Sequence, residues 1–280
     1  MKMLETMNTT YDPKLTLKEI STTISTIGIK KANTQLWQLF ILGILAGIYI
    51  SVGAHVYIVA IEQGIGKIVA GACFGIGLVM VVIAGAELFT GNIMMIADTL
   101  AKLYSPAKLL SNWIIVYAGN FVGAVACAYL VYISGIFGDN LSMTSTGKTA
   151  ASIADYKMAL SFTEAFVRGI FCNMLVILPI IMSYFSKDII SKVVCIILPV
   201  MAFVASGFEH CVANMYLIPA GVFTKQAPLS GFLQIFHNLL PVTLGNIVGG
   251  LVIILIHPNR LRQIETLLKK KSAKHRGPGV

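Results

Sequence analysis

Long runs of apolar residues dominate the chain, and short polar segments separate them. A helix needs roughly 20 consecutive apolar residues to cross the hydrocarbon core of a bilayer. Runs of about this length predict an all-α integral membrane protein with six transmembrane helices. These helices are expected at about residues 36–61, 67–85, 109–136, 158–185, 189–207 and 232–257.

The second and fifth apolar runs end in the same polar pattern, G-x-E-x-x-x-x-N, and the two copies lie 122 positions apart. The third and sixth runs share a second pattern, G-N-x-V-G, whose copies lie 126 positions apart. The chain therefore consists of two related halves. The polar residues of the first pattern are Glu87 and Asn92 in the first half and Glu209 and Asn214 in the second.

Three crossings in each half place the two halves in opposite orientations, as inverted repeats related by an axis in the membrane plane. We expect the second and fifth helices to be broken at residues 87–92 and 209–214. Irregular backbone inside a bilayer is tolerated only where protein or a water-filled cavity satisfies it. Glu87 and Glu209 are therefore expected to accept hydrogen bonds from backbone amides, and the breaks favour a channel or transporter over a membrane anchor.

The ends of the chain are polar and basic, which divides it into three regions. We expect an amphipathic N-terminal segment at 1–35, a six-span channel domain at 36–257 and a basic tail at 258–280. Apolar positions 17, 20, 24 and 27 share one helical face. That helix either lies on the membrane surface or occludes the pore as a mobile plug. The polar start carries no signal-peptide pattern, so the first span is expected to be retained.

Lysine and arginine residues are distributed unequally over the two faces that six spans create. With both termini on one face, that face carries 16 of these residues and the other carries 4. Cytoplasmic segments hold the excess of positive charge in membrane proteins. Both termini are therefore expected in the cytoplasm of a cell-membrane protein, and the net charge of +9 is explained without nucleic-acid binding.

The amino-acid composition also indicates a membrane protein. Hydrophobic residues make up 56% of the chain, charged residues make up 12%, and the mean hydropathy is +0.81. A soluble domain this apolar could not cover its surface with polar groups. The five cysteines show no C-x-x-C spacing, so we expect packing residues and neither a metal site nor a cofactor.

Ionisable residues inside apolar runs are usually paired or functional. Glu164 and Arg168 are four positions apart on one predicted helix, so an ion pair between them is expected. His210 adjoins the second break and is expected to line a pore, with Thr90 at the first break as a second polar group. Lys157 lies at one end of the fourth span, where it can raise the local concentration of anions.

Three of these segments, in order, resemble the signatures of the formate/nitrite transporter family: G-A-E-L-F-T-G-N at 85–92, R-G-I-F-C-N at 168–173 and G-F-E-H-C-V-A-N-M at 207–215. The resemblance implies an aquaporin-like fold, assembled as a homopentamer in the lipid bilayer, with one pore for small monovalent anions in each protomer. It implies a central chamber at His210, Thr90, Asn173 and Glu209, a vestibule lysine at Lys157, and hydrophobic constrictions at Phe74, Leu78, Leu88, Phe89, Val176 and Phe203.

Among the known branches, the loop sequence reads most like the hydrosulfide-conducting members, so hydrosulfide is favoured over formate and nitrite. Cys211 stands where serine is common in the family. An anion between the constrictions loses its hydration, which is unfavourable for an unpaired charge. His210 is expected to help it across, either as an imidazolium that donates to the anion or by passing a proton that leaves a neutral acid.

Two other classes stay open. A neutral-solute channel of the aquaporin type would usually carry a pair of Asn-Pro-Ala motifs at its half-helices, and these are absent from the sequence. A haem- or quinone-dependent oxidoreductase subunit would need facing histidines on separate helices. His55 and His210 are the candidates for that pair, but an enzyme is not the expected function.

Overall fold

The computed structural model describes residues 17–139 and 141–256, and the expected basic tail at 258–280 lies outside them. The described residues form helices and connecting loops, with no β-strand among them. In chain order the elements are α1 (Leu17–Asn33), α2 (Leu36–Glu62), α3 (Lys67–Met80), η1 (Val81–Gly85), α4 (Phe89–Asn92), η2 (Ile93–Met95), α5 (Ile96–Leu100), α6 (Pro106–Ile133), α7 (Ser145–Met158), α8 (Phe162–Phe185), α9 (Ile189–Ala205), α10 (Cys211–Thr224), α11 (Leu229–Leu233) and α12 (Ile235–Ile256).

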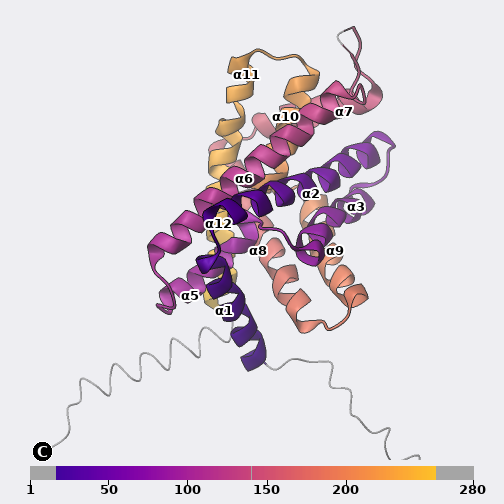
Figure 1. The fold of residues 1–280 in the computed structure, drawn as a ribbon. Helices are drawn as coiled ribbons and strands as arrows, with labels where there is room; N and C mark the ends of the chain where they lie inside the picture. Colours follow the sequence, from indigo (N-terminus) through magenta and orange to yellow (C-terminus); the bar gives the residue numbers. More distant parts are fainter. Residues whose placement is uncertain (1–16, 140, 257–280) are drawn as a thin grey trace, which may run out of the picture.

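The helices form a bundle (Figure 1), and the bounds of the long apolar helices follow most of the predicted spans. α2, α6 and α8 are continuous helices long and apolar enough to cross a membrane, as are α3 with η1 and α11 with α12. The fifth crossing consists of α9 followed by α10, two shorter apolar helices with an interruption between them. The all-α membrane fold with broken second and fifth helices is therefore confirmed.

Helix packing in the first half is repeated in the second. A Cβ atom on Gly119 of α6 would lie 2.6 Å from the carbonyl oxygen of Phe40 in α2, well inside van der Waals contact. Gly245 of α12 meets the carbonyl of Phe166 in α8 in the same way. Small residues therefore let α2 approach α6, and α8 approach α12, at backbone distance.

α7 is a helix that the apolar pattern did not predict. The fourth span was expected to start at residue 158, but α7 ends at Met158 and α8 begins at Phe162. α7 is rich in Ala, Ser and Thr and lacks the apolar periodicity on which the prediction depends. In chain order α7 precedes α8 as α1 precedes α2, so each half begins with a short helix before its first span.

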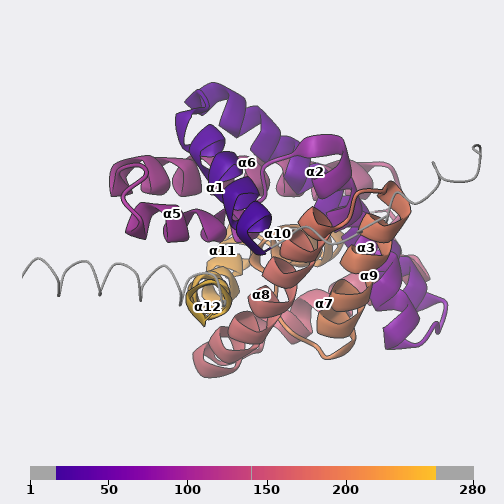
Figure 2. The same ribbon diagram turned by 90° about the horizontal axis from the view of Figure 1, so that it is seen from below.

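α1 and α7 lie at opposite ends of the bundle, as inverted repeats require (Figure 1). Viewed from the α1 end, α1 lies over the bundle against α6 and α8 (Figure 2). The predicted N-terminal helix is confirmed over its described length, Leu17–Asn33. We refer below to the α1 end and the α7 end of the molecule.

Candidate functional site

Each broken span passes through a short extended segment that begins at a glycine. Gly85 and Gly207 have φ angles of 82° and 73°, in the left-handed region that favours glycine. The chain then continues to Leu88 and His210, the extended N-cap residues of α4 and α10. The turn at the glycine and the extended residues after it interrupt both helices, with the two glycines exposed and the N-cap residues Leu88 and His210 buried.

Asn120 of α6 holds the backbone of the first break. Its Oδ1 accepts a hydrogen bond from the Phe89 N–H at 2.9 Å. Its Nδ2 donates to the carbonyl oxygens of Glu87 at 2.9 Å and of Gly43 in α2 at 2.8 Å. One buried side chain thus satisfies backbone groups on both sides of the interruption and ties them to two spans.

Asn246 of α12 does the same for the second break. Its Oδ1 accepts from the Cys211 N–H at 2.9 Å, and its Nδ2 donates to the carbonyl oxygens of Glu209 and Gly169 at 2.9 and 2.8 Å. Asn120 and Asn246 are the asparagines of the repeated G-N-x-V-G pattern. The prediction that the glutamate side chains accept from backbone amides is wrong, because these asparagines fill that role.

Glu209 instead forms an ion pair with the predicted vestibule lysine. Lys157 Nζ lies 2.8 Å from Glu209 Oε1, and the two side chains are 11% and 2% exposed. Asn214 Nδ2 donates to Glu209 Oε2 at 2.6 Å and to Asn238 Oδ1 at 2.7 Å. Asn238 Nδ2 in turn donates to the Lys157 carbonyl at 2.8 Å. We call these four residues the α7 cluster.

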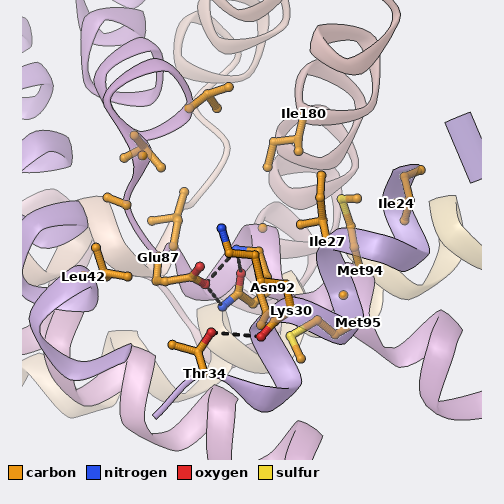
Figure 3. Close-up of a pocket in the computed structure, with 18 of the residues that line it drawn as sticks. Ile24, Ile27, Lys30, Thr34, Leu42, Glu87, Asn92, Met94, Met95 and Ile180 are labelled. Atoms are coloured by element: carbon orange, nitrogen blue, oxygen red, sulfur yellow. Dashed lines mark hydrogen bonds and ion pairs between the residues drawn. The ribbon is translucent and has the colours of Figure 1, made fainter. Parts of the chain in front are cut away.

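The first half contains a matching set, the α1 cluster of Lys31, Glu87, Asn92 and Asn112. Lys31 Nζ lies 2.7 Å from Glu87 Oε2 and 2.8 Å from Asn92 Oδ1. Asn92 Nδ2 donates to Glu87 Oε2 at 2.7 Å and to Asn112 Oδ1 at 2.8 Å. Glu87 and Asn92 point toward one another across this cluster (Figure 3). The Lys31–Glu87 pair is more exposed than its counterpart, with side chains at 22% and 13%.

Lys31 is a residue of the site that the sequence analysis missed. It was counted only as one of several basic residues before the first span. Lys31 and Lys157 are 126 positions apart, the same offset as the repeated G-N-x-V-G pattern. Applying that offset to Lys157 would have identified Lys31, and applying it to Asn238 would have identified Asn112.

Each cluster lines a cavity at its own end of the molecule. The α1 cavity has a volume of about 800 Å³ and is lined by Lys31, Glu87 and Leu88, among others. The α7 cavity has a volume of about 340 Å³, and its lining includes Lys157, Glu209 and His210. Both cavities are therefore places where a cation, a carboxylate and an amide group meet, on walls that combine apolar and other polar residues.

A hydrogen bond joins the two halves next to the cavities, since His210 lines the α7 cavity and Gly91, the neighbour of Thr90, lines the α1 cavity. Thr90 Oγ1 lies 2.9 Å from His210 Nε2, and both residues are buried. His210 Nδ1 also accepts from the Ala213 N–H at 3.1 Å, which caps α10. Because Nδ1 accepts, a neutral His210 in this geometry carries its proton on Nε2 and donates it to Thr90. The structure thus brings together the two chamber residues predicted from separate breaks.

Aromatic and aliphatic residues flank this contact. The rings of Phe74 and Phe203 meet edge to face at 5.9 Å, and Phe203 lies 6.1 Å from the His210 ring. Both phenylalanines line the α7 cavity, whereas Leu88 lines the α1 cavity. Of the other predicted constriction residues, Leu78 and Val176 are buried in the core and line neither cavity.

Phe89 differs from the other predicted constriction residues. Its ring packs against Trp113 at 6.0 Å and against Tyr117 at 4.9 Å, both from α6. Phe89 lines neither cavity. Its position follows from the break, because its N–H is held by Asn120 of the same helix. The structure thus packs the Phe89 ring on α6, and its predicted place at a constriction stays a prediction.

Asn173, another predicted chamber residue, connects the two halves through its amide. Its Nδ2 donates to the Thr90 carbonyl at 3.3 Å and to the Asn246 carbonyl at 2.7 Å. It therefore orients the residue that contacts His210. His55 lies elsewhere, with Nδ1 2.9 Å from the Tyr216 hydroxyl, and its ring is packed near Phe137. The structure does not bring His55 and His210 together as a ligand pair.

The predicted ion pair between Glu164 and Arg168 does not form. Glu164 accepts from the N–H and hydroxyl of Ser161 in a capping box that starts α8. The Arg168 guanidinium donates instead to the Tyr156 hydroxyl and lies over the ring of that residue. The N-terminal cap competes successfully for the carboxylate because the start of α8 leaves backbone amides without helical partners.

Comparison with known proteins gives consistent matches over this whole region. The family model described as "Formate/nitrite transporter" matches residues 18–258. A formate channel, FocA, from Haemophilus influenzae is 37% identical over 251 residues, covering 80% of this chain and 86% of the relative. A probable formate transporter from Methanothermobacter thermautotrophicus is 40% identical over 250 residues, covering 82% and 90%.

Solved structures agree in fold. One described as an FNT family ion channel superposes with a TM-score of 0.75 at 30% identity, covering 85% of this chain and 96% of the other. Another, described as a pentameric formate channel with formate bound, gives a TM-score of 0.66 at 33% identity, covering 78% and 94%.

Proposed function

Because this chain belongs to the formate/nitrite transporter family, we propose that it is a channel for small monovalent weak-acid anions, with formate as a principal substrate. The observation that carries the proposal is the pair of cavities, each with a lysine-containing cluster, on either side of the buried Thr90–His210 contact. A cation in an apolar vestibule concentrates anions before the narrow region that they must cross.

The two clusters can attract an anion without binding it tightly. Each lysine is already paired with a glutamate, at 2.7 Å in the α1 cluster and 2.8 Å in the α7 cluster. An entering anion competes with that carboxylate and so binds weakly, which favours release at the far side. Conduction requires binding strong enough for entry and weak enough for exit. The arrangement at both ends supports passage in either direction.

The cap geometry of His210 supports a neutral donor at the centre of the path. Nδ1 is occupied by the Ala213 N–H, so an imidazolium would lose the helix cap. It would also place a positive charge at the positive end of the α10 dipole. We therefore propose that Nε2–H turns from Thr90 to the passing anion, while the Thr90 hydroxyl offers a second donor. Of the two roles expected from the sequence, donation by a neutral ring is the one that this geometry favours.

Formate replaces hydrosulfide as the favoured substrate. The relatives described above are named as formate channels or a probable formate transporter, and one solved neighbour is described with formate bound. The preference for hydrosulfide rested on the loop sequence alone. Formate also offers two oxygen acceptors to the Nε2–H and hydroxyl donors, whereas hydrosulfide offers one weakly accepting sulfur.

The test is a flux panel in proteoliposomes containing the purified protein. We expect rapid formate and nitrite flux, slower hydrosulfide flux and poor chloride flux, relative to protein-free liposomes. Water and glycerol permeation in the same vesicles serve as the controls for a neutral-solute channel. Fast water or glycerol flux without formate flux would overturn the proposal.

Assembly and orientation complete the proposal. A solved neighbour described as pentameric supports a homopentamer with one pore per protomer. The lysine and arginine bias supports both termini in the cytoplasm of a cell membrane, which would make the α1 cavity the inner mouth and the α7 cavity the outer mouth.

A further inference from the structure

Arg168 has a position that the transport path described so far does not use. In the described part of the chain no carboxylate lies within ion-pair distance of its guanidinium, because Glu164 is engaged by Ser161. Arg168 Nη1 donates to the Tyr156 hydroxyl, and its Cζ lies 5.6 Å from the centre of the Tyr156 ring. Tyr156 itself lines the α7 cavity.

This contact changes what the Tyr156 hydroxyl can do. A phenol hydroxyl has one proton to donate and accepts through its oxygen. When the oxygen accepts from a guanidinium, the O–H bond becomes more polarised, because hydrogen bonds in a chain strengthen one another. The hydroxyl is then a better donor to an anion than a tyrosine hydroxyl that is hydrogen-bonded only to water.

We propose that the Tyr156 hydroxyl, positioned and polarised by Arg168, is an entry site for small carboxylates at the mouth of the α7 cavity. The inference rests on the proposed anion-channel function and adds a residue to it. Exposure falls along the lining of this cavity, from 55% at Tyr156 to 11% at the Lys157 side chain and 3% at His210. Tyr156 is therefore the most exposed of these three lining residues, and we place it before Lys157 and His210 on the path of an entering anion.

The internal repeat supports this placement. The offset of 126 positions relates Tyr156 to Lys30 and Arg168 to Leu42. Lys30 lines the α1 cavity as Tyr156 lines the α7 cavity, whereas Leu42 lines the α1 cavity and Arg168 contacts Tyr156 without lining the α7 cavity. The α1 cavity has the cation Lys30 where the α7 cavity has Tyr156. Each mouth thus carries further polar groups in addition to its paired lysine, among them Lys30 and Thr34 at the α1 cavity and Tyr156 and Lys67 at the α7 cavity.

A merely structural role, linking α7 to α8, makes different predictions from anion binding. Removing a structural link lowers protein yield or maximal flux without changing the dependence of flux on formate concentration. Removing an entry donor raises the apparent KM and leaves the maximal flux near the wild-type value. Loss of the guanidinium charge adds a salt-dependent part, since its attraction acts through solvent and is screened.

The variants Tyr156→Phe, Arg168→Gln and Arg168→Lys separate these possibilities in proteoliposomes, with formate added on the α7 side. Lys225→Gln is the matched control, because Lys225 pairs with Asp155 near the same end but does not line the cavity. We expect Tyr156→Phe to raise the apparent KM about three- to tenfold, the usual worth of one hydrogen bond. Arg168→Gln should raise it at least as much at about 20 mM salt and less at about 300 mM. Arg168→Lys should raise the apparent KM less than Arg168→Gln does. Lys225→Gln should leave the apparent KM unchanged.

A wild-type KM in Tyr156→Phe would overturn the inference while leaving the channel function intact. Absence of formate flux in the wild-type protein would instead overturn the proposed function itself. If Arg168→Gln fails to fold, Tyr156→Phe alone decides the question, because its ring can still pack against the guanidinium.

Discussion

His210 has two roles that mutation can separate. It accepts the Ala213 N–H through Nδ1 and faces Thr90 through Nε2. An asparagine at this position is a good N-cap and carries a neutral N–H donor, but it cannot take up or release a proton at physiological pH.

We expect His210→Asn to retain a substantial fraction of formate flux, about a tenth or more, because a donor and the cap both survive. His210→Ala should lose both and conduct at least about tenfold less than His210→Asn. Flux measured in proteoliposomes at several pH values decides between donation and proton transfer. Equal loss of flux in both variants would favour a titrating histidine over the neutral donor.

The two lysines should differ in their effect on stability. Lys157→Gln leaves Glu209 buried without its cation, and breaking a buried pair in this way typically costs about 3 kcal/mol. Lys31→Gln should cost less because the Lys31–Glu87 pair is more exposed to solvent. Thermal unfolding in mild detergent measures both. The double variant Lys157→Gln/Glu209→Gln should recover part of the loss, and a failure to recover would show that the pair itself is not responsible.

How far individual residues could be predicted depended on whether they stood out in an apolar run. His210, Thr90 and Lys157 did, and in the structure Thr90 contacts His210, while His210 and Lys157 line the same cavity. Lys31 lies among other basic residues before the first span, where its burial against Glu87 leaves no local signal. The motif also could not show that the Phe89 ring packs on Tyr117 of α6, because that contact joins residues far apart in the sequence.

At the scale of elements, the broken spans depend on residues distant in sequence. A half-helix that ends inside a bilayer leaves backbone groups that water cannot satisfy. Glycine alone permits the turn, but Asn120 and Asn246 supply the hydrogen bonds that keep the extended segments in place. The breaks were predictable from the repeated glutamate motif, whereas the asparagines were recognised only as a second repeat.

We expect Asn246→Ala to lower the free energy of unfolding by about 3 kcal/mol or more, because three backbone groups at the second break lose their partner at once. Asn120→Ala is the equivalent change in the first half and should have a similar effect. Chemical or thermal unfolding of the two variants in detergent provides the comparison. A near wild-type stability for either variant would mean that the break is held by other contacts.

The position of α1 bears on the two roles expected for it, either a helix on the membrane surface or a mobile plug in the pore. In the structure Ile24 and Ile27 line the α1 cavity, and Lys31 completes the α1 cluster. Removing residues 14–31 should therefore lower stability and flux together, since Glu87 loses its partner.

The substitution Ser25→Ala tests the plug hypothesis without removing α1. The Ser25 hydroxyl donates to Asp98 Oδ1 at 2.8 Å, and this contact helps to hold α1 against the bundle. The substitution removes this hydrogen bond but keeps Lys31. If α1 is a wall of the cavity, flux in Ser25→Ala should stay near the wild-type value. A rise in basal formate flux with unchanged anion preference would support the mobile plug instead.

The whole molecule presents apolar side chains to its surroundings along most of its spans. Exposed residues such as Leu110, Ile114 and Leu130 on α6 face outward, as Phe236 and Leu240 do on α12. These faces suit lipid or a neighbouring protomer equally, so the sequence pattern predicts burial in a membrane but cannot count subunits.

We expect native mass spectrometry of the protein in mild detergent to show five copies. The expectation comes from a solved neighbour described as pentameric. Dilution in the same detergent is the control for non-specific association. A stable monomer or trimer that still conducts formate in liposomes would contradict the pentamer without affecting the pore.

The matched clusters at the two ends have a consequence for how the chain enters the membrane. Turned upside down, the molecule would present nearly the same helices, the same breaks and a lysine–glutamate pair at each mouth. Because the two ends are built alike, the helices specify the direction of insertion only weakly, and the basic residues outside the spans are expected to set it. Moving several lysines from the loops on one face to the loops on the other is then expected to yield protein inserted in both orientations. Each copy should be folded and carry a complete path.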